Sequence, residues 1–296
     1  MDKPAGRTSH DVVARVRRVL SGAKVGHAGT LDPDATGVLV LCVGNATKIS
    51  AFLMEGEKEY RGVGRLGVVT DTQDASGQVL AERKVDVTLE NLREAAREFL
   101  GRIEQIPPMF SAVKIDGQKL YRLARKGVEV ERPARTVHVR SFEITSIDGA
   151  DFEFVVTCSK GTYVRTLVHD LGARLGCGGH LARLVRSRQG GFSLENAVPW
   201  AALEEADAAA AIGRAKVDPD QALEFLPECD LSTGPDPVRA GALLPRDRAP
   251  EDVEGVVRVR LPGGRHGGIA RIDDEGVRVL HLFPPGSTWG RGRRTS

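Results

Sequence analysis

Apolar residues recur at helical spacing in three parts of the chain. After Ser9, apolar residues three and four positions apart predict a helix that begins at this serine and ends near Gly22. The same spacing in residues 88–100 predicts a second helix, which Gly101 closes. Residues 166–175 predict a third helix.

Continuous or alternating apolar runs predict strands elsewhere. Residues 38–43 form an uninterrupted apolar run, typical of a buried strand, and residues 58–68, 137–147 and 152–158 alternate. Beyond residue 250, the segments GVVRVRL, GIARID and VRVLHLF are separated by glycine turns and predict a small β-barrel or sandwich. Because helices do not strictly alternate with strands, the expected fold class is α+β.

Shifts in composition divide the chain into two expected domains. Residues 1–228 form the larger one, which ends in an acidic, alanine-rich helical edge and linker at 200–228. Prolines, glycines and many cations mark residues 105–135 as an inserted basic arm with a short helix. Residues 229–296 form a small β-rich domain, with a tail from about 290 that we expect to be disordered.

The composition excludes several classes of protein. Of 296 residues, 41% are hydrophobic and 28% charged, as in globular rather than disordered or fibrous chains. The uncharged stretch 37–47 is far shorter than the roughly 20 residues of a membrane helix, and the N-terminus lacks an apolar signal core, so we expect a cytoplasmic protein. The four cysteines and seven histidines show no metal-ligand spacing, so neither disulfides nor a metal site is expected.

Basic residues are distributed unevenly. Residues 114–140 hold eight Lys/Arg against three Asp/Glu, and residues 158–190 hold six against one, whereas residues 200–225 hold two against six. Such polarity suits an extended polyanion better than a small ligand. On charge alone, two solvated faces are an equally good interpretation.

The loop at 26–37, GHAGTLDPDATG, lies between a basic helix and an apolar strand and has the most unusual chemistry of the chain. On its own, the Asp32-Pro33 pair is a turn dipeptide and favours a structural role. The glycines match neither phosphate-binding pattern, so a phosphate cradle has weak support. A second segment, CSKGTYVRT at 158–166, places a cation and an aromatic residue at a strand-to-helix junction.

Together these segments resemble the bacterial tRNA pseudouridine-55 synthases, the TruB family. The resemblance runs from Asp2 to about Trp200, and beyond it thins to a general similarity with PUA-like modules. It is carried, in the family's order, by DKPAGRTSHDVVARVRR, VGHAGTLDPDATGVLVLCVGNATK, EKEYRGVGRLGVVTDTQDASG, QIPPMFSAVKIDGQKLYRLARKGVEV, CSKGTYVRTLVHDLG and LGCGGHLARLVR. One departure is that the family usually has a short apolar strand before DKP, which is lost or truncated in this sequence.

The resemblance implies a pseudouridine synthase fold, a mixed, mainly antiparallel sheet flanked by helices, and a reaction without a cofactor. Uracil leaves C1′ of its ribose, turns over and rejoins through C5. Asp32 matches the catalytic aspartate, and Arg165 matches the arginine that pairs with it, lowers the pKa of its carboxyl and fixes its orientation. Whether Asp32 attacks C1′ or C6, or acts through a glycal, stays open.

The implied substrate is uridine 55 in the T-arm of tRNA, whose base must flip out of the folded RNA. Tyr60 matches the tyrosine that stacks on the flipped base and is a candidate for handling the C5 proton, while His27 matches the histidine that fills the vacated space. Tyr163 and Leu184 match further pocket positions. Phosphate contacts are expected from Lys3, Lys114, Lys119, Arg122 and Lys160. We further expect a monomer, with no metal and no membrane, whose C-terminal domain contacts the acceptor end of tRNA.

Two other functions are compatible with the sequence. One is a noncatalytic module that binds or folds RNA, and the other is a guide-RNA-dependent relative that works inside a ribonucleoprotein. The combination of Asp32, Tyr60 and Arg165 favours retained catalysis. Long basic tails and a fuller PUA domain would support the guide-RNA-dependent relative, and neither is evident.

Overall fold

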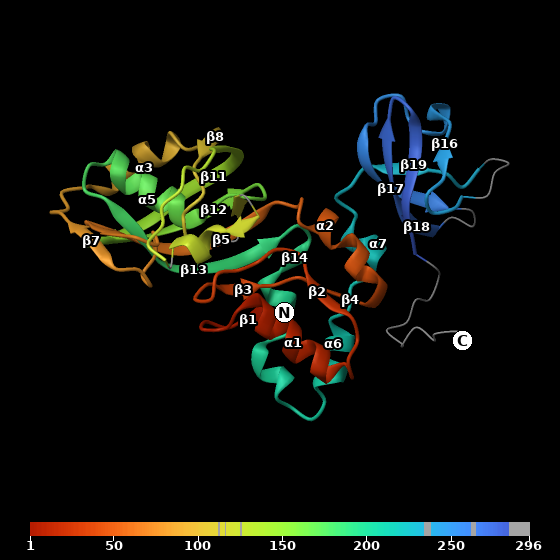
Figure 1. Cartoon of the computed structure of the whole chain (residues 1–296), viewed down its shortest axis with the longest axis horizontal. Helices are drawn as coiled ribbons and strands as arrows, with labels where there is room; N and C mark the ends of the chain where they lie inside the picture. Colours follow the sequence, from red (N-terminus) through yellow and green to blue (C-terminus); the bar gives the residue numbers. More distant parts are fainter. Residues whose placement is uncertain (112, 116, 125, 234–237, 262–264, 284–296) are drawn as a thin grey trace.

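The computed structural model describes residues 1–111, 113–115, 117–124, 126–233, 238–261 and 265–283. Its largest sheet, called the central sheet below, is mixed and extends from the left of Figure 1 to the middle. The strand order is β1-β3-β13-β5-β12-β11-β8, and β14 pairs with β13. In that order the bounds are Asp2–Lys3, Thr36–Val38, Gly179–Gln189, Lys58–Leu66, Asp151–Cys158, Arg135–Asp148, Gly101–Gln105 and, for β14, Phe192–Ser193. The β13–β3 pair is parallel and the other pairs are antiparallel. The prediction of an α+β fold with a mainly antiparallel sheet is confirmed.

Two glycines on β5 make room for aromatic side chains in the core of this sheet. β5 buries every second residue, and its Gly62 and Gly64 face the rings of Phe154 and Phe152 on β12. A Cβ would lie 2.4 Å from a ring atom at Gly62 and 2.3 Å from one at Gly64. Glycine is therefore required for these phenylalanines, each 1% exposed, to fill the core.

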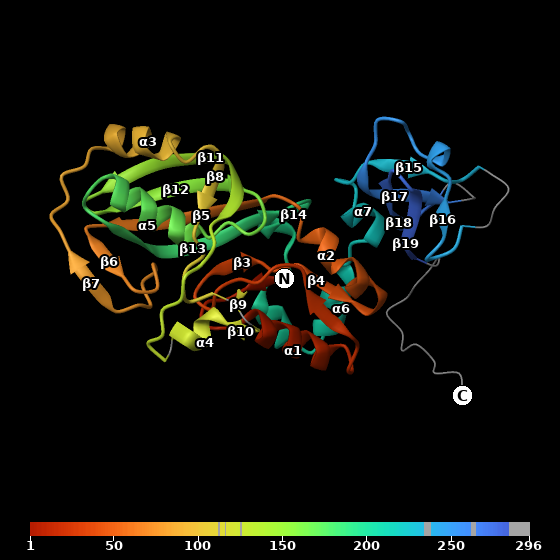
Figure 2. The ribbon, with the colours of Figure 1, turned by 45° about the horizontal axis from the view of Figure 1, so that its top comes forward.

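Amphipathic helices cover one face of the sheet. α3 (Leu89–Arg97) packs on β11, α5 (Val164–Arg174) packs on β13, and the two helices contact each other (Figure 2). Both confirm a predicted helix, although α3 ends earlier than the apolar spacing suggested.

Helix α1 (Ser9–Val19) begins at Ser9 as predicted, but the structure corrects the expectation that Ser9 is its N-cap. Its N-cap is Thr8, which accepts a hydrogen bond from the Asp11 amide while the Asp11 carboxylate accepts one from the Thr8 amide. Ser9 is buried instead, and its hydroxyl points to the neighbouring loop. Serine and threonine are both good caps, so the sequence alone did not distinguish them.

The single strand predicted at 38–43 is wrong. β3 ends at Val38 in the central sheet, whereas β4 (Leu41–Val43) pairs with β2 (Val25–His27) in a separate two-stranded sheet. Leu39 and Val40 are buried across the break, so the apolar run gave no sign of it. The chain continues into the short helices η1 (Gly44–Ile49) and α2 (Ser50–Leu53).

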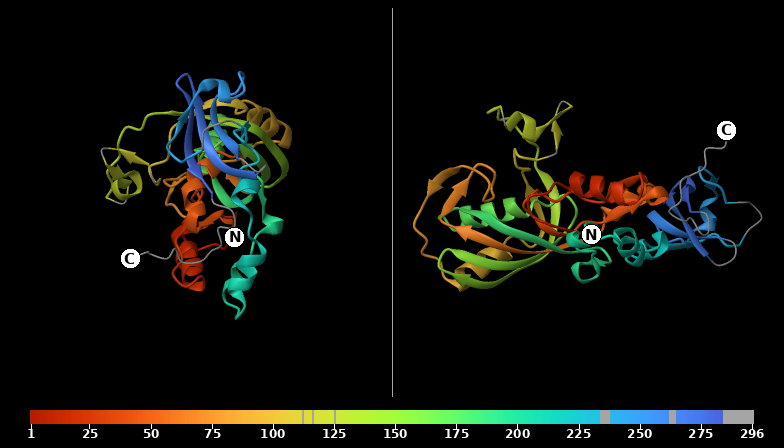
Figure 3. Two further views of the ribbon diagram at one scale, coloured as in Figure 1. Left: turned by 90° about the vertical axis from the view of Figure 1, so that its right-hand side faces the viewer. Right: turned by 90° about the horizontal axis from the view of Figure 1, so that it is seen from below.

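Two excursions leave the central sheet before β11. A hairpin of β6 (Val68–Thr70) and β7 (Val79–Glu82) follows β5. The basic arm contains a second hairpin, β9 (Lys114–Ile115) and β10 (Gln118–Lys119), followed by α4 (Leu120–Ala124). The arm stands away from the sheet in the right-hand view of Figure 3, as expected for an insertion.

The C-terminal part is a separate five-stranded sheet of order β15-β17-β18-β19-β16. Its strands are Glu228–Asp230, Gly255–Leu261, Arg265–Asp273, Gly276–Leu282 and Leu243–Leu244, and the last three predicted strands are confirmed as β17, β18 and β19. The alanine-rich stretch before it forms only short helices. In chain order, the short helices from β14 onward are η2 (Leu194–Asn196), η3 (Trp200–Leu203), α6 (Ala208–Arg214), α7 (Pro219–Ala222) and η4 (Arg246–Arg248).

The C-terminal sheet has a core of its own and also shares one with the larger part. Val257, Val259 and Val277 are fully buried within it. A further cluster of buried apolar residues includes Ile269 of β18 together with Ala28 and Val38 at the two ends of the 26–37 loop. Residues on both sides of the expected boundary at 228 thus contribute to a common core.

Two expectations concern membranes and the tail. The helices that the structure describes are at most 11 residues long, and none has the length and apolar character that crossing a bilayer requires. The tail expected to be disordered, from about 290, lies outside the described residues.

Candidate active site

The backbone of the loop between β2 and β3 is fixed by hydrogen bonds. The six consecutive carbonyl oxygens of residues 28–33 each accept one. Gln189 donates to Ala28, Arg186 to Gly29 and Thr30, Ser9 to Leu31, the Ala35 amide to Asp32, and Lys3 to Pro33. Because the side-chain donors come from β1, α1 and β13, three elements hold the backbone on which Asp32 stands.

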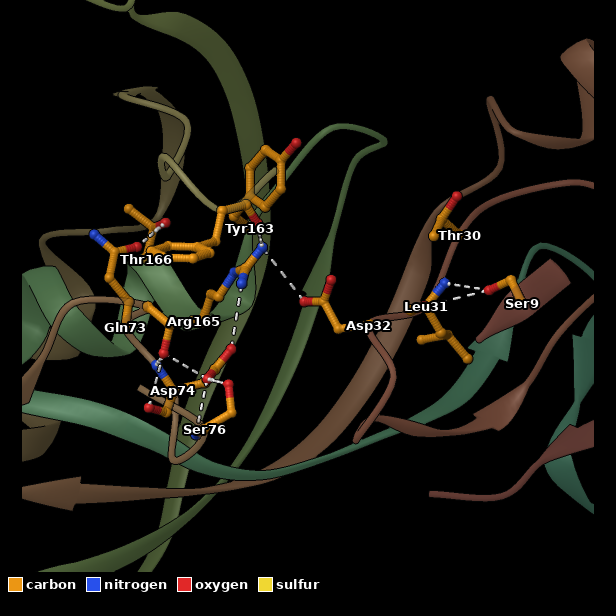
Figure 4. A network of polar contacts seen from close by, with 12 residues as sticks. Ser9, Thr30, Leu31, Asp32, Gln73, Asp74, Ser76, Tyr163, Arg165 and Thr166 are labelled. Carbon is orange, nitrogen blue, oxygen red and sulfur yellow. Dashed lines mark hydrogen bonds and ion pairs between the residues drawn. The ribbon is translucent and has the colours of Figure 1, made fainter. Parts of the chain in front are cut away.

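Ser9 connects helix α1 to this loop. Its hydroxyl accepts a hydrogen bond from the Leu31 amide (3.0 Å) and donates one to the Leu31 carbonyl (3.3 Å), as Figure 4 shows. The Leu31 side chain is 4% exposed and belongs to the main hydrophobic core. The side chain of the next residue, Asp32, is 46% exposed, so the catalytic candidate faces outward from a fixed backbone.

The structure corrects the expected role of Lys3. Its side chain is fully buried, and its ammonium donates to the carbonyls of Pro4 (2.9 Å), Arg7 (2.7 Å) and Pro33 (2.7 Å). All three donors are therefore used inside the protein, and none is left for a phosphate. Burial lowers the pKa of Lys3 to about 8.

Asp32 and Arg165 are in contact, and a second carboxylate completes the group. Arg165 Nη2 lies 3.6 Å from Asp32 Oδ2, and Arg165 Nη1 lies 3.2 Å from Asp74 Oδ2 (Figure 4). Arg165 is 5% exposed, whereas Asp74 is 22% exposed. One buried guanidinium thus bridges two carboxylates, of which Asp32 is the more accessible.

Asp74 is itself held in place by its own turn. Its Oδ1 accepts hydrogen bonds from the Thr72 hydroxyl (2.7 Å), the Ser76 hydroxyl (2.6 Å) and the Ser76 amide (3.0 Å). Oδ2 is then directed at Arg165. These contacts fix one side of the guanidinium and leave the other side toward Asp32.

Arg165 is also held by a backbone carbonyl, by the Tyr163 ring and, indirectly, by Gln105. Its Nη2 donates to the Phe110 carbonyl (2.7 Å), and its guanidinium lies 5.7 Å from the centre of the Tyr163 ring. The buried Gln105 side chain accepts from the Tyr163 amide (2.8 Å) and donates to its carbonyl (3.1 Å). Gln105 thereby fixes Tyr163, the residue directly before α5. Arg165 lies in the first turn of this helix.

The net pKa shift of Asp32 has the opposite direction from the one expected. Desolvation by the surrounding protein raises the pKa of Asp32, and the nearby Asp74 carboxylate adds to that effect. Arg165 lowers it, as expected, and so does Lys3, but both together do not outweigh desolvation. The charged form of Asp32 is therefore harder to maintain than that of a free aspartate.

The residues expected around the flipped base are largely buried. Tyr60 is 7% and Leu184 9% exposed, and both belong to the main core, while Tyr163 is half-buried. The ring of His27 lies edge-on to that of His10, with centroids 5.5 Å apart, and its Nδ1 is buried without a partner among the described residues. Burial and His10 lower the pKa of His27, which favours its neutral form. The roles of these residues toward RNA stay predictions.

Two of the remaining basic candidates lie at the surface. Lys160 is exposed and forms an ion pair with Glu55 at 2.6 Å, and Arg122 on α4 is also exposed. The side chains of Lys114 and Lys119 lie outside the described part of the chain. Contacts of these residues with phosphates stay predictions.

The four cysteines are free and buried. Among the described residues, no group of three or more His, Cys, Asp or Glu side chains is arranged to hold a metal ion.

Three polar residues of this site were not predicted from the sequence. Asp74 lies in a turn rich in polar residues, and nothing in the sequence distinguishes it from the other polar residues of that turn. Gln105 and Arg186 are polar residues inside β-strands, at positions that are 2% and 1% exposed. For Arg186, the available sequence signal is a charged residue at an inward position of a β-strand.

Two family models match the chain in succession. Residues 17–164 match the TruB family pseudouridylate synthase N-terminal domain, and residues 165–223 match the tRNA pseudouridylate synthase B C-terminal domain. Both matches end before the five-stranded C-terminal sheet, so its PUA-like character stays a prediction.

Curated relatives are similar over nearly the full chain. The tRNA pseudouridine synthase B of Aromatoleum aromaticum is 45% identical over 279 residues, covering 94% of this chain and 89% of that protein. The tRNA pseudouridine synthase B of Geobacter sulfurreducens is 47% identical, covering 96% of this chain and 98% of that protein.

Solved structures share the fold. A chain in a Cbf5-Nop10-Gar1 complex superposes with a TM-score of 0.70 at 26% identity, covering 98% of this chain and 85% of that one. A chain from an H/ACA RNP bound to a substrate RNA containing 2′-deoxyuridine gives a TM-score of 0.69 at 24% identity, over 97% of this chain and 84% of that one.

Proposed function

The chain belongs to the TruB family of pseudouridylate synthases, and from this membership we propose that it is a tRNA pseudouridine synthase that converts uridine 55 of the T-loop to pseudouridine. The observation that carries the proposal is the contact of the exposed Asp32 carboxylate with the buried Arg165 guanidinium. The enzyme is an isomerase, since its substrate and product have the same composition.

The reaction balances within the nucleotide itself. The N1–C1′ bond of uridine breaks and a C5–C1′ bond forms. The proton lost from C5 is matched by the proton that N1 gains. No oxidant, reductant or external group enters this balance, which is why the proposal includes no cofactor.

Asp32 acts in its ionised form, as the nucleophile at C1′ or C6 or as the stabiliser of the ribosyl fragment in a glycal route. Desolvation raises the pKa of Asp32, so the carboxylate is less stabilised by its surroundings than one in water. Its fixed backbone holds the oxygens at one place while the uracil turns over. The weaker stabilisation of the carboxylate and its fixed position both make Asp32 more reactive toward the bound uridine.

Arg165 keeps Asp32 ionised and oriented. Its positive charge acts against desolvation, and Asp74 holds the guanidinium from the other side at 3.2 Å. The Arg165–Asp32 distance of 3.6 Å is longer than that of a strong charged hydrogen bond, so Asp32 keeps lone pairs available for substrate.

RNA recognition completes the proposal. Flipping the uridine costs a few kcal/mol, which stacking against Tyr60 and contacts with Tyr163 and Leu184 offset, while His27 fills the space left in the T-loop. Cations at the surface such as Arg122 and Lys160 attract the phosphates. The protein acts as a cytoplasmic monomer, and its C-terminal sheet contacts the acceptor end of tRNA.

The comparisons favour an enzyme that works without a guide RNA. Identity is 45–47% to the two synthase B proteins but 24–26% to the chains from the H/ACA RNP and the Cbf5-Nop10-Gar1 complex. The higher similarity lies with proteins named for tRNA.

The test uses purified protein and unmodified tRNA transcripts. We expect pseudouridine at position 55, mapped by carbodiimide modification and primer extension, without added guide RNA or metal. A transcript with cytidine at position 55 is the matched control and should remain unmodified. Tight tRNA binding without any pseudouridine would favour the noncatalytic RNA-folding module instead.

A further inference from the structure

We propose that Arg186 is a positioning residue for the reaction, which holds the loop of Asp32 in register with the strand of Tyr60 without touching the substrate. This role presupposes the proposed function, because it concerns how that same site is assembled.

Arg186 occupies the position in the sheet where the two catalytic elements meet. It lies on β13, between β3 on one side and β5 on the other. Its backbone pairs with Gly37, which follows the catalytic loop, and with Tyr60. Arg186 is thus adjacent both to the end of the loop that carries Asp32 and to β5, the strand that carries Tyr60.

The guanidinium of Arg186 binds the loop on both sides of Asp32. Before the aspartate, Nη2 donates to the Gly29 carbonyl (3.0 Å) and Nη1 to the Thr30 carbonyl (3.4 Å). After it, Nε donates to the Val38 carbonyl (2.7 Å). The rigid fork therefore sets the separation between the two ends of the loop, which a flexible single donor does not do.

Arg186 also acts on Tyr60. Arg186 and Tyr60 are direct partners across the β13–β5 pair. Burial raises the pKa of the Tyr60 hydroxyl, while the charge of Arg186 acts in the opposite direction. A displaced guanidinium would therefore change the electrostatic surroundings of the phenol as well as the loop.

Stability alone does not explain a cation at this position. Arg186 is 1% exposed and, within the described part of the chain, has no carboxylate at ion-pair distance. Burying an unpaired charge opposes folding, and carbonyl hydrogen bonds compensate only in part. The loop also has other supports, since Ser9, Lys3 and Gln189 hold three of its carbonyls. Loss of Arg186 should therefore misplace Asp32 rather than unfold the domain.

The experiment compares Arg186→Met with Lys58→Met as a matched control. Lys58 is also a buried cation, 6% exposed, but it donates to the carbonyls of Met54 and Gly56, outside the catalytic loop. The readouts are the single-turnover rate on saturating unmodified tRNA, the Kd for tRNA and the thermal midpoint. We expect Arg186→Met to lower the rate by about 10²-fold, with Kd changed less than about threefold. Lys58→Met should lose thermal stability but keep a rate within about threefold of wild type.

Arg186→Lys separates geometry from charge. It keeps the positive charge, but its compact ammonium lacks the rigid fork that sets the separation between the Gly29, Thr30 and Val38 carbonyls, so we expect a rate closer to Arg186→Met than to wild type. A wild-type rate for Arg186→Lys would overturn the proposal, as would equal rates for Arg186→Met and Lys58→Met. If Arg186→Met does not fold, the Lys variant decides the question. An inactive wild-type protein would instead overturn the proposed function.

Discussion

Gly37→Ala tests whether the close approach of β3 to β13 holds the catalytic loop in place. Gly37 has φ +98°, and a Cβ there would lie 2.3 Å from the Arg186 carbonyl oxygen and 2.9 Å from its amide nitrogen. The unfavourable backbone conformation costs about 1–3 kcal/mol. The clash is with backbone rather than a flexible side chain, so overpacking adds about 1–3 kcal/mol. We expect a total loss of about 2–6 kcal/mol, a large part of the stability of an ordinary domain.

Gly22→Ala is the control for Gly37→Ala, because Gly22 has φ +85° but no atom within 4 Å of a Cβ. It should lose only the conformational part, about 1–3 kcal/mol. Urea unfolding of both variants, with unchanged m-values, isolates the cost of the close approach. To relieve the clash, β3 has to retreat from β13 by roughly 1 Å, and displacement on that scale costs about 10²-fold in rate. Equal unfolding free energies for the two variants would refute a tight β3–β13 approach.

Four further predictions concern charge. Asp32→Asn should lower the rate to less than about a hundredth of wild type while tRNA binding persists. Because desolvation raises the pKa of Asp32, the charged aspartate destabilises the folded protein near pH 7, so Asp32→Asn should have a higher melting temperature than wild type there. This difference in melting temperature should shrink as the pH falls from the pKa of Asp32 in the folded protein to its pKa in the unfolded chain. A difference that stays constant across pH would contradict the raised pKa. In Arg165→Met the cation that favours the charged carboxylate is gone, so the acid limb of the pH–rate profile should move to higher pH, and an unmoved limb would contradict the pairing. Arg122 and Lys126 are two exposed cations of the basic arm. Neutralising both should flatten the salt dependence of tRNA affinity, by about 0.7–0.9 in slope for each phosphate that is no longer neutralised, whereas an unchanged slope would make them ordinary surface residues.

Hydrophobic patterning predicted elements with one buried face well. The helix at 88–100 and the strands at 137–147 and 152–158 are confirmed to within a few residues. Hydrophobic patterning gave a wrong prediction where one apolar run continues from one sheet into another. The pattern shows which residues are buried but not which element packs against them. The break after Val38 and the core shared with Ile269 are both of this kind.

The site was predicted less evenly than the fold. Asp32 and Arg165 came from the resemblance of long motifs, since on its own the Asp32-Pro33 pair favoured a turn. Lys3 and Arg186 show why the rest was not predicted: a cation in a sequence suggests a solvated or RNA-facing residue, whereas here both bind carbonyls of a loop in the interior. Only the tertiary structure brings those acceptors and donors together.

The core shared between Ala28, Val38 and Ile269 has a consequence for how the chain is made. Synthesis proceeds from the N-terminus, so the Asp32 loop leaves the ribosome long before β18, which completes the apolar cluster beside it. The contacts that finish this region join segments near opposite ends of the chain, and such long closures form late in folding. Until β18 has been synthesised, a nascent chain should therefore expose the apolar residues of this cluster next to an incompletely packed active site. Protection by chaperones should matter most shortly before the ribosome releases the chain.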